Sequence, residues 1–365
     1  MKAIFFWGGV TTHTYGLAEA MSKYFKNIYA IVMPESLLRK ERVAKMPINN
    51  TIQIEYCNQK SDIKRIISLE DKDHSIHVNA SLKRGNLANV ALKYLCKNNY
   101  HVMSFPQEAF QLEGFKGYVN YIKWFIYLHC TYRNKIDAFG LTGFNAEKQF
   151  KYLFINKQKT FQFLYITNFY ENGIYDTNKR IKFIFVGGID KRKNIIPFVK
   201  WMMKYPNQNF DFEIYGSWTK DEELRKLVEN STNIHYYGKK DYSFIRNAMA
   251  KADWLVLPSL HDGWGAVINE GLQSGCKILV SKQSGASSII ISNASLGYVF
   301  DAHKFKELNK IMNLIMDKGP LSLSEKKSIV KWSQNHIGYD VIGVYLKNII
   351  CHYYNMKEKP SALWL

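Results

Sequence analysis

The segment Asp253–Gly275 (DWLVLPSLHDGWGAVINEGLQSG) holds two carboxylates and a glycine-rich loop within one predicted strand, loop and helix. An apolar run ends at a Pro-Ser pair, the loop carries Asp262, and the helix after it carries Glu270. Free N–H groups at a helix start attract phosphate, and glycines let a diphosphate come close to the backbone. Carboxylates accept hydrogen bonds from hydroxyl groups. The segment therefore fits a neutral polyol beside a diphosphate; its loop residues are Gly263, Trp264 and Gly265.

A second segment, Phe185–Asn194 (FVGGIDKRKN), places two glycines after another predicted strand and basic residues shortly beyond them. Cations beside a leaving diphosphate stabilise the charge that develops on it, and Arg192 and Lys193 supply such charge here. The plain alternative for this basic run is a solvated turn. For Asp262 the alternative is an ordinary turn residue, and for Glu270 it is an exposed helix face. The glycines of the segment are Gly187 and Gly188.

The first segment resembles the signature of the family-4 retaining glycosyltransferases of the GT-B fold, usually P-S-x-x-E-G-F-G-x-x-x-x-E. In that family the first acidic residue contacts the donor sugar and the second contacts the ribose hydroxyls. The resemblance gives these roles to Asp262 and Glu270, with Asp where Glu is usual. The second segment resembles the family's V-G-R-x-x-x-x-K-G turn, which grips the donor diphosphate. Lys193 matches its lysine, Gly188 stands where its arginine is usual, and Arg192 is expected to supply the missing charge.

Weaker matches extend the resemblance in both directions. The strand end at Tyr215 and Gly216 resembles the one that borders the nucleotide in the family, and Gly238 and Lys239 resemble the turn that faces the base. Ser284-Gly285 resembles the glycine pair after the next strand. Near the N-terminus a glycine pair follows the first strand. In these enzymes a glycine-rich loop at the same place faces the donor phosphates and the acceptor. The acceptor-side candidates are Gly8, Gly9, His13 and Glu108, with a structural histidine and a surface glutamate as the plain alternatives.

These segments belong to a chain that alternates short apolar runs with amphipathic stretches. Such alternation predicts parallel sheets with helices on both faces, and ligands bind these sheets at the carboxyl ends of the strands. A polar, turn-rich stretch, Asn168–Arg180, interrupts the pattern and is interpreted as a linker between two doubly wound domains. Three of the helices expected in the N-terminal half are Leu17–Phe25, Leu37–Lys45 and Tyr118–Tyr132.

The resemblance implies the GT-B fold, in which two Rossmann-like domains with parallel sheets face each other across a cleft. We expect an acceptor-binding domain over residues 1–170, a nucleotide-sugar-binding domain over residues 171–335 and a helical tail over residues 336–365 that returns to the N-terminal domain. The implied activity is transfer of a sugar, with retention of configuration, from a nucleotide-diphosphate sugar to a glycan or polyprenyl-diphosphate-linked acceptor. Bacterial surface polysaccharide synthesis, such as that of lipopolysaccharide O-antigen or capsule, is the implied setting. No cofactor is expected, and no metal, because no D-x-D motif stands beside a strand end.

The 365 residues include 50 basic and 31 acidic side chains, a formal net charge of +19. This surplus favours an anionic partner, which could be nucleic acid, a membrane or a phosphorylated substrate; a lysine-rich solvated surface is the alternative. No recognised nucleic-acid-binding motif holds the basic residues, so nucleic acid is not the expected partner. A basic nucleic-acid-binding protein and a sugar-nucleotide epimerase on the same fold remain the alternative functions.

The five cysteines are scattered without a C-x-x-C motif, which indicates a reducing compartment and argues against a zinc site. No window approaches the ~18 apolar residues of a membrane span. The segment Phe115–Lys135 interleaves aromatic and basic residues, as helices at an anionic membrane interface do, and Arg39–Lys45 adds a second basic stretch. An aromatic core face with solvated lysines is the alternative. We expect a cytoplasmic protein, with peripheral attachment to the inner face of the cytoplasmic membrane through Phe115–Lys135.

Overall fold

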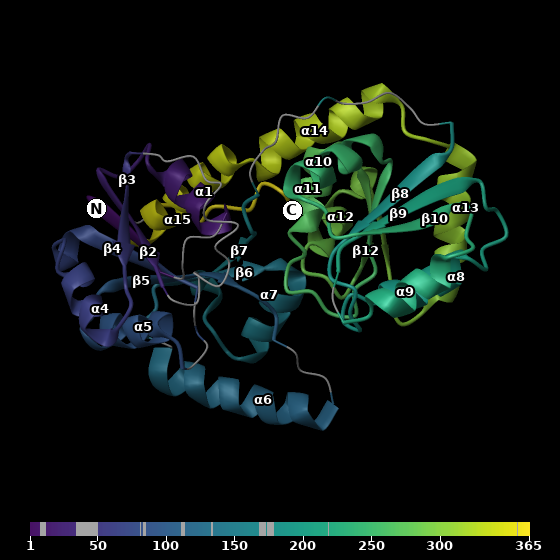
Figure 1. The fold of residues 1–365 in the computed structure, drawn as a ribbon. Coiled ribbons are helices and arrows are strands. Elements are labelled where there is room, and N and C mark those ends of the chain that lie inside the picture. The colour runs from purple at the N-terminus through teal and green to yellow at the C-terminus, as the bar shows by residue number, and fades with distance from the viewer. Residues whose placement is uncertain are drawn as a thin grey trace. The chain divides into compact units, whose positions relative to one another are not determined.

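The computed structural model describes residues 1–7, 12–33, 50–80, 82, 85–110, 114–132, 134–167, 173, 179–217, 219–355 and 357–365, with only the backbone of residues 12–14, 114 and 116. Contacts divide the chain into two units (Figure 1). The first comprises Met1–Asn168 and Gly338–Leu363, and the second comprises Phe169–Ile337 and Trp364–Leu365. The expected helix Leu37–Lys45, the basic stretch Arg39–Lys45 and most of the expected linker lie outside the described residues.

The first unit is built on a parallel sheet of seven strands in the order β3-β2-β1-β4-β5-β6-β7. The strand β1, which lies between β2 and β4, is apolar along its whole length and buried, as expected for a strand covered on both faces. The strands are β1 (Ala3–Trp7), β2 (Asn27–Val32), β3 (Ile52–Tyr56), β4 (Ser75–Asn79), β5 (His101–Gln107), β6 (Ala138–Thr142) and β7 (Thr160–Phe163).

The helices of the first unit cover both faces of this sheet. They are α1 (Thr12–Met21), α4 (Lys60–Ile67), α5 (Leu87–Lys97), α6 (Gly114–Tyr127), α7 (Gly143–Tyr152) and α15 (Tyr339–Asn355). α15 comes from the far end of the chain and packs against α1. The two helices approach closely, because a Cβ on Gly343 would lie 2.7 Å from the Cβ of Ala20. Tyr354, which is partly exposed, adds an anchor by donating a 2.6 Å hydrogen bond to Oδ2 of Asp137.

The second unit holds a parallel six-stranded sheet in the order β10-β9-β8-β11-β12-β13. Figure 1 shows α8, α9 and α13 over one face and α10, α11 and α12 over the other. The strands are β8 (Ile181–Val186), β9 (Phe210–Tyr215), β10 (Ile234–Gly238), β11 (Trp254–Leu257), β12 (Lys277–Ser281) and β13 (Gly297–Phe300). The helices are α8 (Ile195–Met202), α9 (Asp221–Val228), α10 (Tyr242–Lys251), α11 (Val267–Gln273), α12 (Ser287–Ser292), α13 (Leu308–Lys318) and α14 (Leu323–Ile337).

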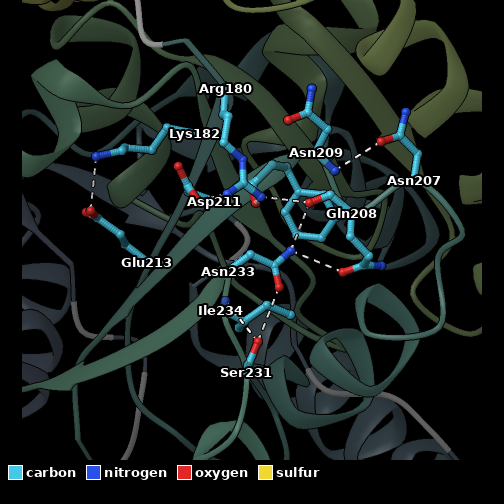
Figure 2. A network of polar contacts seen from close by, with 11 residues as sticks. Arg180, Lys182, Asn207, Gln208, Asn209, Asp211, Glu213, Ser231, Asn233 and Ile234 are labelled. Atoms are coloured by element: carbon cyan, nitrogen blue, oxygen red, sulfur yellow. Dashed lines mark hydrogen bonds and ion pairs between the residues drawn. The ribbon is translucent and has the colours of Figure 1, made fainter.

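Polar side chains fasten the amino-terminal ends of β8, β9 and β10 to one another (Figure 2). Arg180 donates hydrogen bonds of 2.8 Å to the carbonyls of Gln208 and Phe210. The amide of Asn233 donates to the carbonyl of Gln208 at 3.3 Å and to its side-chain oxygen at 3.1 Å. These contacts satisfy carbonyl groups that the sheet leaves unpaired at this edge. Structural contacts therefore occupy the amino edge, and the carboxyl edge is where doubly wound sheets bind their ligands.

The alternation of apolar and amphipathic segments predicted two doubly wound parallel sheets, and that prediction is confirmed. The expected helix Leu17–Phe25 is wrong in its bounds, since α1 ends at Met21. The amides of Tyr24 and Phe25 bond back to the Met21 carbonyl in a turn that leads into β2. The strands β7 and β13 were not predicted, because each has only four residues and β13 begins with glycine.

The expected helix Tyr118–Tyr132 is also wrong in its bounds. α6 begins at Gly114 and ends at Tyr127, and a π-helical turn covers Leu128–Tyr132. Buried Asn89 explains the change of winding, because its amide donates 3.1 Å hydrogen bonds to the hydroxyls of both Tyr127 and Tyr132. The two hydroxyls are themselves 2.9 Å apart, so the wider turn brings both phenols to one buried polar partner. Within the described ranges, no helix is both long and apolar enough to cross a membrane.

A fully buried histidine, His77, lies in the core of the first unit on β4. The indole of Trp7 donates a 3.0 Å hydrogen bond to its Nδ1, and the ring of Phe5 stacks on it with centroids 4.6 Å apart. Burial, with a smaller contribution from the charge of His101, lowers the pKa of His77 to about 3. An accepting Nδ1 and a low pKa both mean that the imidazole is neutral in the folded protein.

His77 should make the first unit less stable as the pH falls below about 6.5. Its pKa is about 6.5 in an unfolded chain and about 3 in the fold, so the unfolded state binds the proton first. Each pH unit between these values then costs about 1.4 kcal/mol of folding free energy, and the loss is absent above the higher value. Urea unfolding of the parent and of His77→Gln from pH 8 to pH 4 measures this. The difference in the free energy of unfolding between the parent and His77→Gln should shrink as the pH falls. The exposed control, His303→Gln, should show the same pH dependence as the parent.

Candidate functional site

Three glycines meet at the carboxyl edge of β8, β9 and β10. The amide of Gly187 donates to the carbonyl of Tyr215 at 3.0 Å, and the amide of Gly216 donates to the carbonyl of Gly238 at 2.9 Å. Gly216 has φ of +132°, and a Cβ there would lie 1.8 Å from the carbonyl oxygen of Gly187. No other residue fits this position, so the strand end at Gly216 carries no side chain of its own. The hydroxyl of Tyr236 donates a 2.8 Å hydrogen bond to the Gly216 carbonyl, and the side chain of Lys193 lies close to Gly187.

The side chain of Tyr215 does not face this edge. It is buried, its hydroxyl donates to Oε2 of Glu213 at 2.8 Å, and its ring stacks on that of Tyr237 with centroids 5.2 Å apart. Burial raises the pKa of Tyr215, with the nearby Glu213 carboxylate as the second cause. Tyr215 therefore contributes its backbone carbonyl to the edge, while its phenol supports the sheet below.

The basic segment after β8 is folded into a tight turn around Asp190. The Asp190 carboxylate accepts a 2.7 Å hydrogen bond from the amide of Lys193, and its carbonyl accepts one of 3.3 Å from the amide of Asn194. Asn194 adopts the left-handed conformation, with φ of 57°, and begins α8. This turn sends the Lys193 side chain across to the glycine-rich loop, where only 12% of it is exposed.

Lys193 and Asp262 form the central contact of the candidate site. The Nζ of Lys193 lies 2.5 Å from Oδ2 of Asp262, and each side chain is 12% exposed. Arg192 approaches the same oxygen more loosely, with Nη1 at 3.5 Å, and 42% of its side chain is exposed. Arg192 also joins the two loops through its backbone, because its carbonyl accepts a 2.9 Å hydrogen bond from the amide of Leu260. The structure thus brings together the cations and the first carboxylate that the sequence singled out.

The loop that carries Asp262 is held by its backbone and by a buried indole. The carbonyl of Asp262 accepts a 3.0 Å hydrogen bond from the amide of Gly285, and Asp262 forms an isolated parallel bridge with Ser284. Trp264 is fully buried and donates a 3.0 Å hydrogen bond from its indole to Oδ1 of Asn269 on α11. Trp264 is therefore an anchor of the loop, and its ring does not line the surface.

Gly265 turns the chain from this loop into α11. Its φ is +90°, and a Cβ there would lie 2.7 Å from Cδ2 of Leu257 on β11. Glycine thus permits both the left-handed turn and the close approach of the loop to the strand. The neighbouring Gly263 is buried in the same loop.

Glu270 lies on α11 and is partly exposed. Its backbone carbonyl accepts a 2.5 Å hydrogen bond from Nη1 of Arg246, a fully buried residue of α10. Sequence reasoning missed Arg246, because an arginine in an amphipathic helix is normally assigned to the solvent face. The sequence did carry a signal for the burial of Arg246. The apolar residues Met249 and Ala250 follow it by three and four positions, so Arg246 lies on the same buried face of α10.

Asp301 is a second residue that the sequence did not single out. It lies beyond β13, binds Nζ of Lys282 at 2.8 Å and accepts a 2.7 Å hydrogen bond from the amide of Gln283. The Lys282 ammonium is the main cause that holds the pKa of Asp301 well below its usual range. The backbone carbonyl of Gln283 accepts a 3.3 Å hydrogen bond from the amide of Asp262, so Asp301 supports the loop of Asp262 through Gln283.

The remaining predicted residues differ in their exposure. Gly188 is partly exposed next to Gly187, and Lys239 is exposed after β10. In the first unit, Glu108 is exposed just after β5. Gly8 and Gly9 lie outside the described residues, and of His13 only the backbone, in α1, is described. Among the described residues, no three His, Cys, Asp or Glu side chains gather as metal ligands.

Comparison with known proteins agrees with this geometry. Residues 171–334 match the model of the family "Glycosyl transferases group 1", a span that contains both loops and Glu270. An uncharacterized glycosyltransferase of Methanocaldococcus jannaschii, MJ1178, is 29% identical over 115 residues. That match covers 29% of this chain and spans only 31% of the length of the relative.

Solved structures resemble the chain over nearly its whole length. The lipopolysaccharide outer core galactosyltransferase WaaB, in its apo form, and HepE of Anabaena, in complex with UDP, each give a TM-score of 0.70 at 12% identity, covering 96% of this chain and 99% of theirs. A putative UDP-N-acetylglucosamine 2-epimerase of Listeria monocytogenes gives 0.58 at 12% identity, covering 99% of this chain and 98% of its own. The second unit thus carries a glycosyl transferases group 1 domain, and the chain has the two-domain GT-B fold of known glycosyltransferases.

Proposed function

We propose that this protein is a retaining glycosyltransferase whose second unit binds a nucleotide-diphosphate sugar at the carboxyl edge of its sheet. The observation that carries the proposal is the contact of Lys193 and Arg192 with Asp262 beside the glycine strand ends at Gly187 and Gly216. Cations next to a glycine backbone suit a diphosphate, and a fixed carboxylate suits sugar hydroxyls. The structure of HepE with bound UDP supports a nucleotide ligand in this fold.

In this proposal Lys193 connects the two halves of the donor. Its ammonium group has three hydrogen atoms to donate, so it can hold Asp262 and a phosphate oxygen at the same time. Asp262 is then oriented toward the sugar by a contact that is already formed at 2.5 Å. Glu270 is assigned the ribose hydroxyls on the strength of its place in the motif. Both carboxylates act mainly by positioning the donor.

The proposed reaction needs no protein nucleophile. The bond between the anomeric carbon and the diphosphate oxygen breaks, and the acceptor oxygen bonds to the same carbon on the same face. The departing phosphate oxygen takes the acceptor's proton, so charge and atoms balance without a cofactor. Lys193 and Arg192 stabilise the negative charge left on the diphosphate, a task that a metal ion performs in other transferases. On this basis we propose that transfer is metal-independent.

The group 1 match favours a transferase over an epimerase, although the GT-B fold accommodates both. It also disfavours a basic nucleic-acid-binding protein, for which a titration with a polynucleotide in rising salt is the direct test. We further propose a glycan or lipid-linked acceptor, as in the assembly of surface polysaccharides. The likeness to WaaB, a lipopolysaccharide outer core galactosyltransferase, supports this setting.

Replacing Glu270 by alanine should weaken donor binding and lower turnover by about tenfold or more, because hydrogen bonds to charged groups are each worth about 1.5–3 kcal/mol. Calorimetry with a panel of nucleotide sugars, followed by kinetics at subsaturating donor, measures both. The fold should persist, since Arg246 donates to the backbone carbonyl of Glu270, which alanine retains. Glu222→Ala on exposed α9 is the control. Unchanged kinetics would remove Glu270 from the site. Asp262→Glu should be tolerated better than Asp262→Ala.

Lys193→Ala should cost more donor affinity than Arg192→Ala. Lys193 is the more buried cation and holds Asp262 at 2.5 Å, against 3.5 Å for Arg192. A charged hydrogen bond in a dehydrated site contributes about 2–4 kcal/mol, so the first variant should lose at least tenfold in affinity for a nucleoside diphosphate. Calorimetric titration with UDP and GDP tests the ranking, with Lys191→Ala as a control in the same turn. The reverse ranking would give the main phosphate contact to Arg192.

We also propose that α6 attaches the first unit to an anionic membrane. Four apolar side chains on one face of this helix are exposed: Phe115 (82%), Tyr118 (64%), Ile122 (40%) and Ile126 (53%). Their spacing of three and four residues makes a continuous stripe along the helix. Exposed lysines, Lys123 and Lys135, accompany the stripe. An apolar stripe next to basic residues is the pattern of helices that lie in a membrane interface.

This attachment predicts that the protein sediments with anionic vesicles at low salt, ignores neutral vesicles and dissociates as salt rises. Each basic group near the surface contributes about 1 kcal/mol, and salt screens that attraction. Changing Lys116, Lys123 and Lys135 together to Glu, or Phe115 and Tyr118 to Ser, should abolish sedimentation and leave transfer to a short soluble acceptor intact. Tyr56→Ser, which removes an aromatic ring that is 56% exposed on β3, is the matched control. If both multiple variants bind anionic vesicles as the parent does, the stripe is ordinary surface.

A further inference from the structure

An open pocket of about 800 Å³ lies in the second unit, formed by the end of α8 and the segment after β13. None of the residues proposed above to hold the donor lines it. Its volume is within the range of small-molecule sites, about 300–1,000 Å³. The lining consists of three aromatic residues, Trp201, Tyr205 and Phe305, and a rim of polar and basic residues that includes Lys204, His303, Lys304, Lys306 and Glu307.

The aromatic floor of the pocket is held in place from below. The ring of Trp201 lies 6.0 Å from that of Tyr205 and 6.2 Å from that of Phe305, measured between centroids. Tyr205 is buried, and its hydroxyl donates a 2.6 Å hydrogen bond to Asn313 on α13. Trp201 and Phe305 are both partly exposed. The floor is thus a fixed apolar platform that stays open to solvent on one side.

The rim of the pocket is positively charged. Lys204, Lys304 and Lys306 are exposed, His303 adds a further nitrogen, and Glu307 is the single carboxylate in the lining. The three lysines and the one glutamate leave a net charge of +2 with the histidine neutral. A cleft lined by one sign of charge concentrates ligands of the opposite sign. The occupant must therefore be anionic and must present a flat apolar face to the floor.

We propose that this pocket binds an acidic carbohydrate, a glycan segment that carries carboxylate or phosphate groups. A pyranose ring presents an apolar C–H face that stacks on an indole, and its acidic substituents reach the lysines at the rim. This proposal rests on the proposed function, because a glycosyltransferase handles glycans. It assigns the second unit a carbohydrate site in addition to the donor edge, and it gives a specific use to part of the chain's +19 charge.

The pocket is joined to the donor loops within the same unit. The amide of Asn194, which follows Lys193, donates a 3.5 Å hydrogen bond to the carbonyl of Ala302, the residue before His303. Asp301 binds Gln283, whose carbonyl accepts from the amide of Asp262. A glycan seated in the pocket therefore contacts a segment that also supports the donor-binding loop. Such a site would retain a growing acidic glycan between successive transfers.

Calorimetric titration with an oligogalacturonate and with its fully methyl-esterified, neutral form tests the proposal. The acidic oligosaccharide should bind at low salt and the neutral form at least tenfold more weakly. Changing Lys204, Lys304 and Lys306 together to Glu should reduce affinity for the acidic form by at least tenfold, and Trp201→Ala by at least fivefold. Trp201→Phe should restore part of the loss, because it keeps an aromatic surface. Reversing three exposed lysines outside the pocket, Lys318, Lys327 and Lys331, should have less than a twofold effect.

Binding of UDP to the same variants separates this proposal from the donor site. If UDP binds to all of them like the parent while the oligosaccharide does not bind to the parent, the pocket proposal is overturned and the proposed function stands. If the oligosaccharide binds through Trp201 and no nucleotide or nucleotide sugar binds, the pocket stands and the proposed function fails. Equal losses in the pocket variant and the control variant, or stronger binding of a single-stranded oligonucleotide than of the oligosaccharide, would also overturn the carbohydrate assignment.

Discussion

The contact between Lys193 and Asp262 is the interaction on which the candidate site depends. It joins a turn after β8 to a loop after β11, two segments that lie 69 residues apart in the chain. The side chain of Lys193 is long and flexible, and the carboxylate of Asp262 can rotate although its loop is held by backbone contacts and by Trp264. Their mutual 2.5 Å contact restricts both side chains before any ligand arrives. A site whose charged groups are ordered in advance loses less conformational entropy when it binds.

The framework behind that contact could be predicted from the sequence, since it follows from local patterns. The apolar run before the Pro-Ser pair predicted a strand, and the structure places β11 (Trp254–Leu257) there. The strand β7 was missed, because four residues that alternate between buried and partly exposed carry too weak a signal.

The site itself was only partly predictable, because contacts between distant loops are not encoded in a local pattern. The motif identified Lys193 and Asp262 as separate donor ligands, but their pairing required coordinates. Trp264 stays a predicted donor-binding residue, and the structure shows that its ring anchors the loop to α11. Arg246 was overlooked because its charge suggested the solvent face of α10, whereas its position in the helix places it on the buried face. In each case burial decides what the side chain does, and burial depends on the whole fold.

The packing of α15 against α1 has a consequence for the order in which the protein can be made. Residues 1–168 leave the ribosome first, yet the helix that covers α1 includes Gly343 and is synthesised after the whole of the six-stranded sheet. During translation the first unit therefore exposes the apolar face of α1 while the second unit completes its fold. The nascent chain must protect that surface from aggregation for as long as it takes to add residues 169–337, the stretch between the two parts of the first unit.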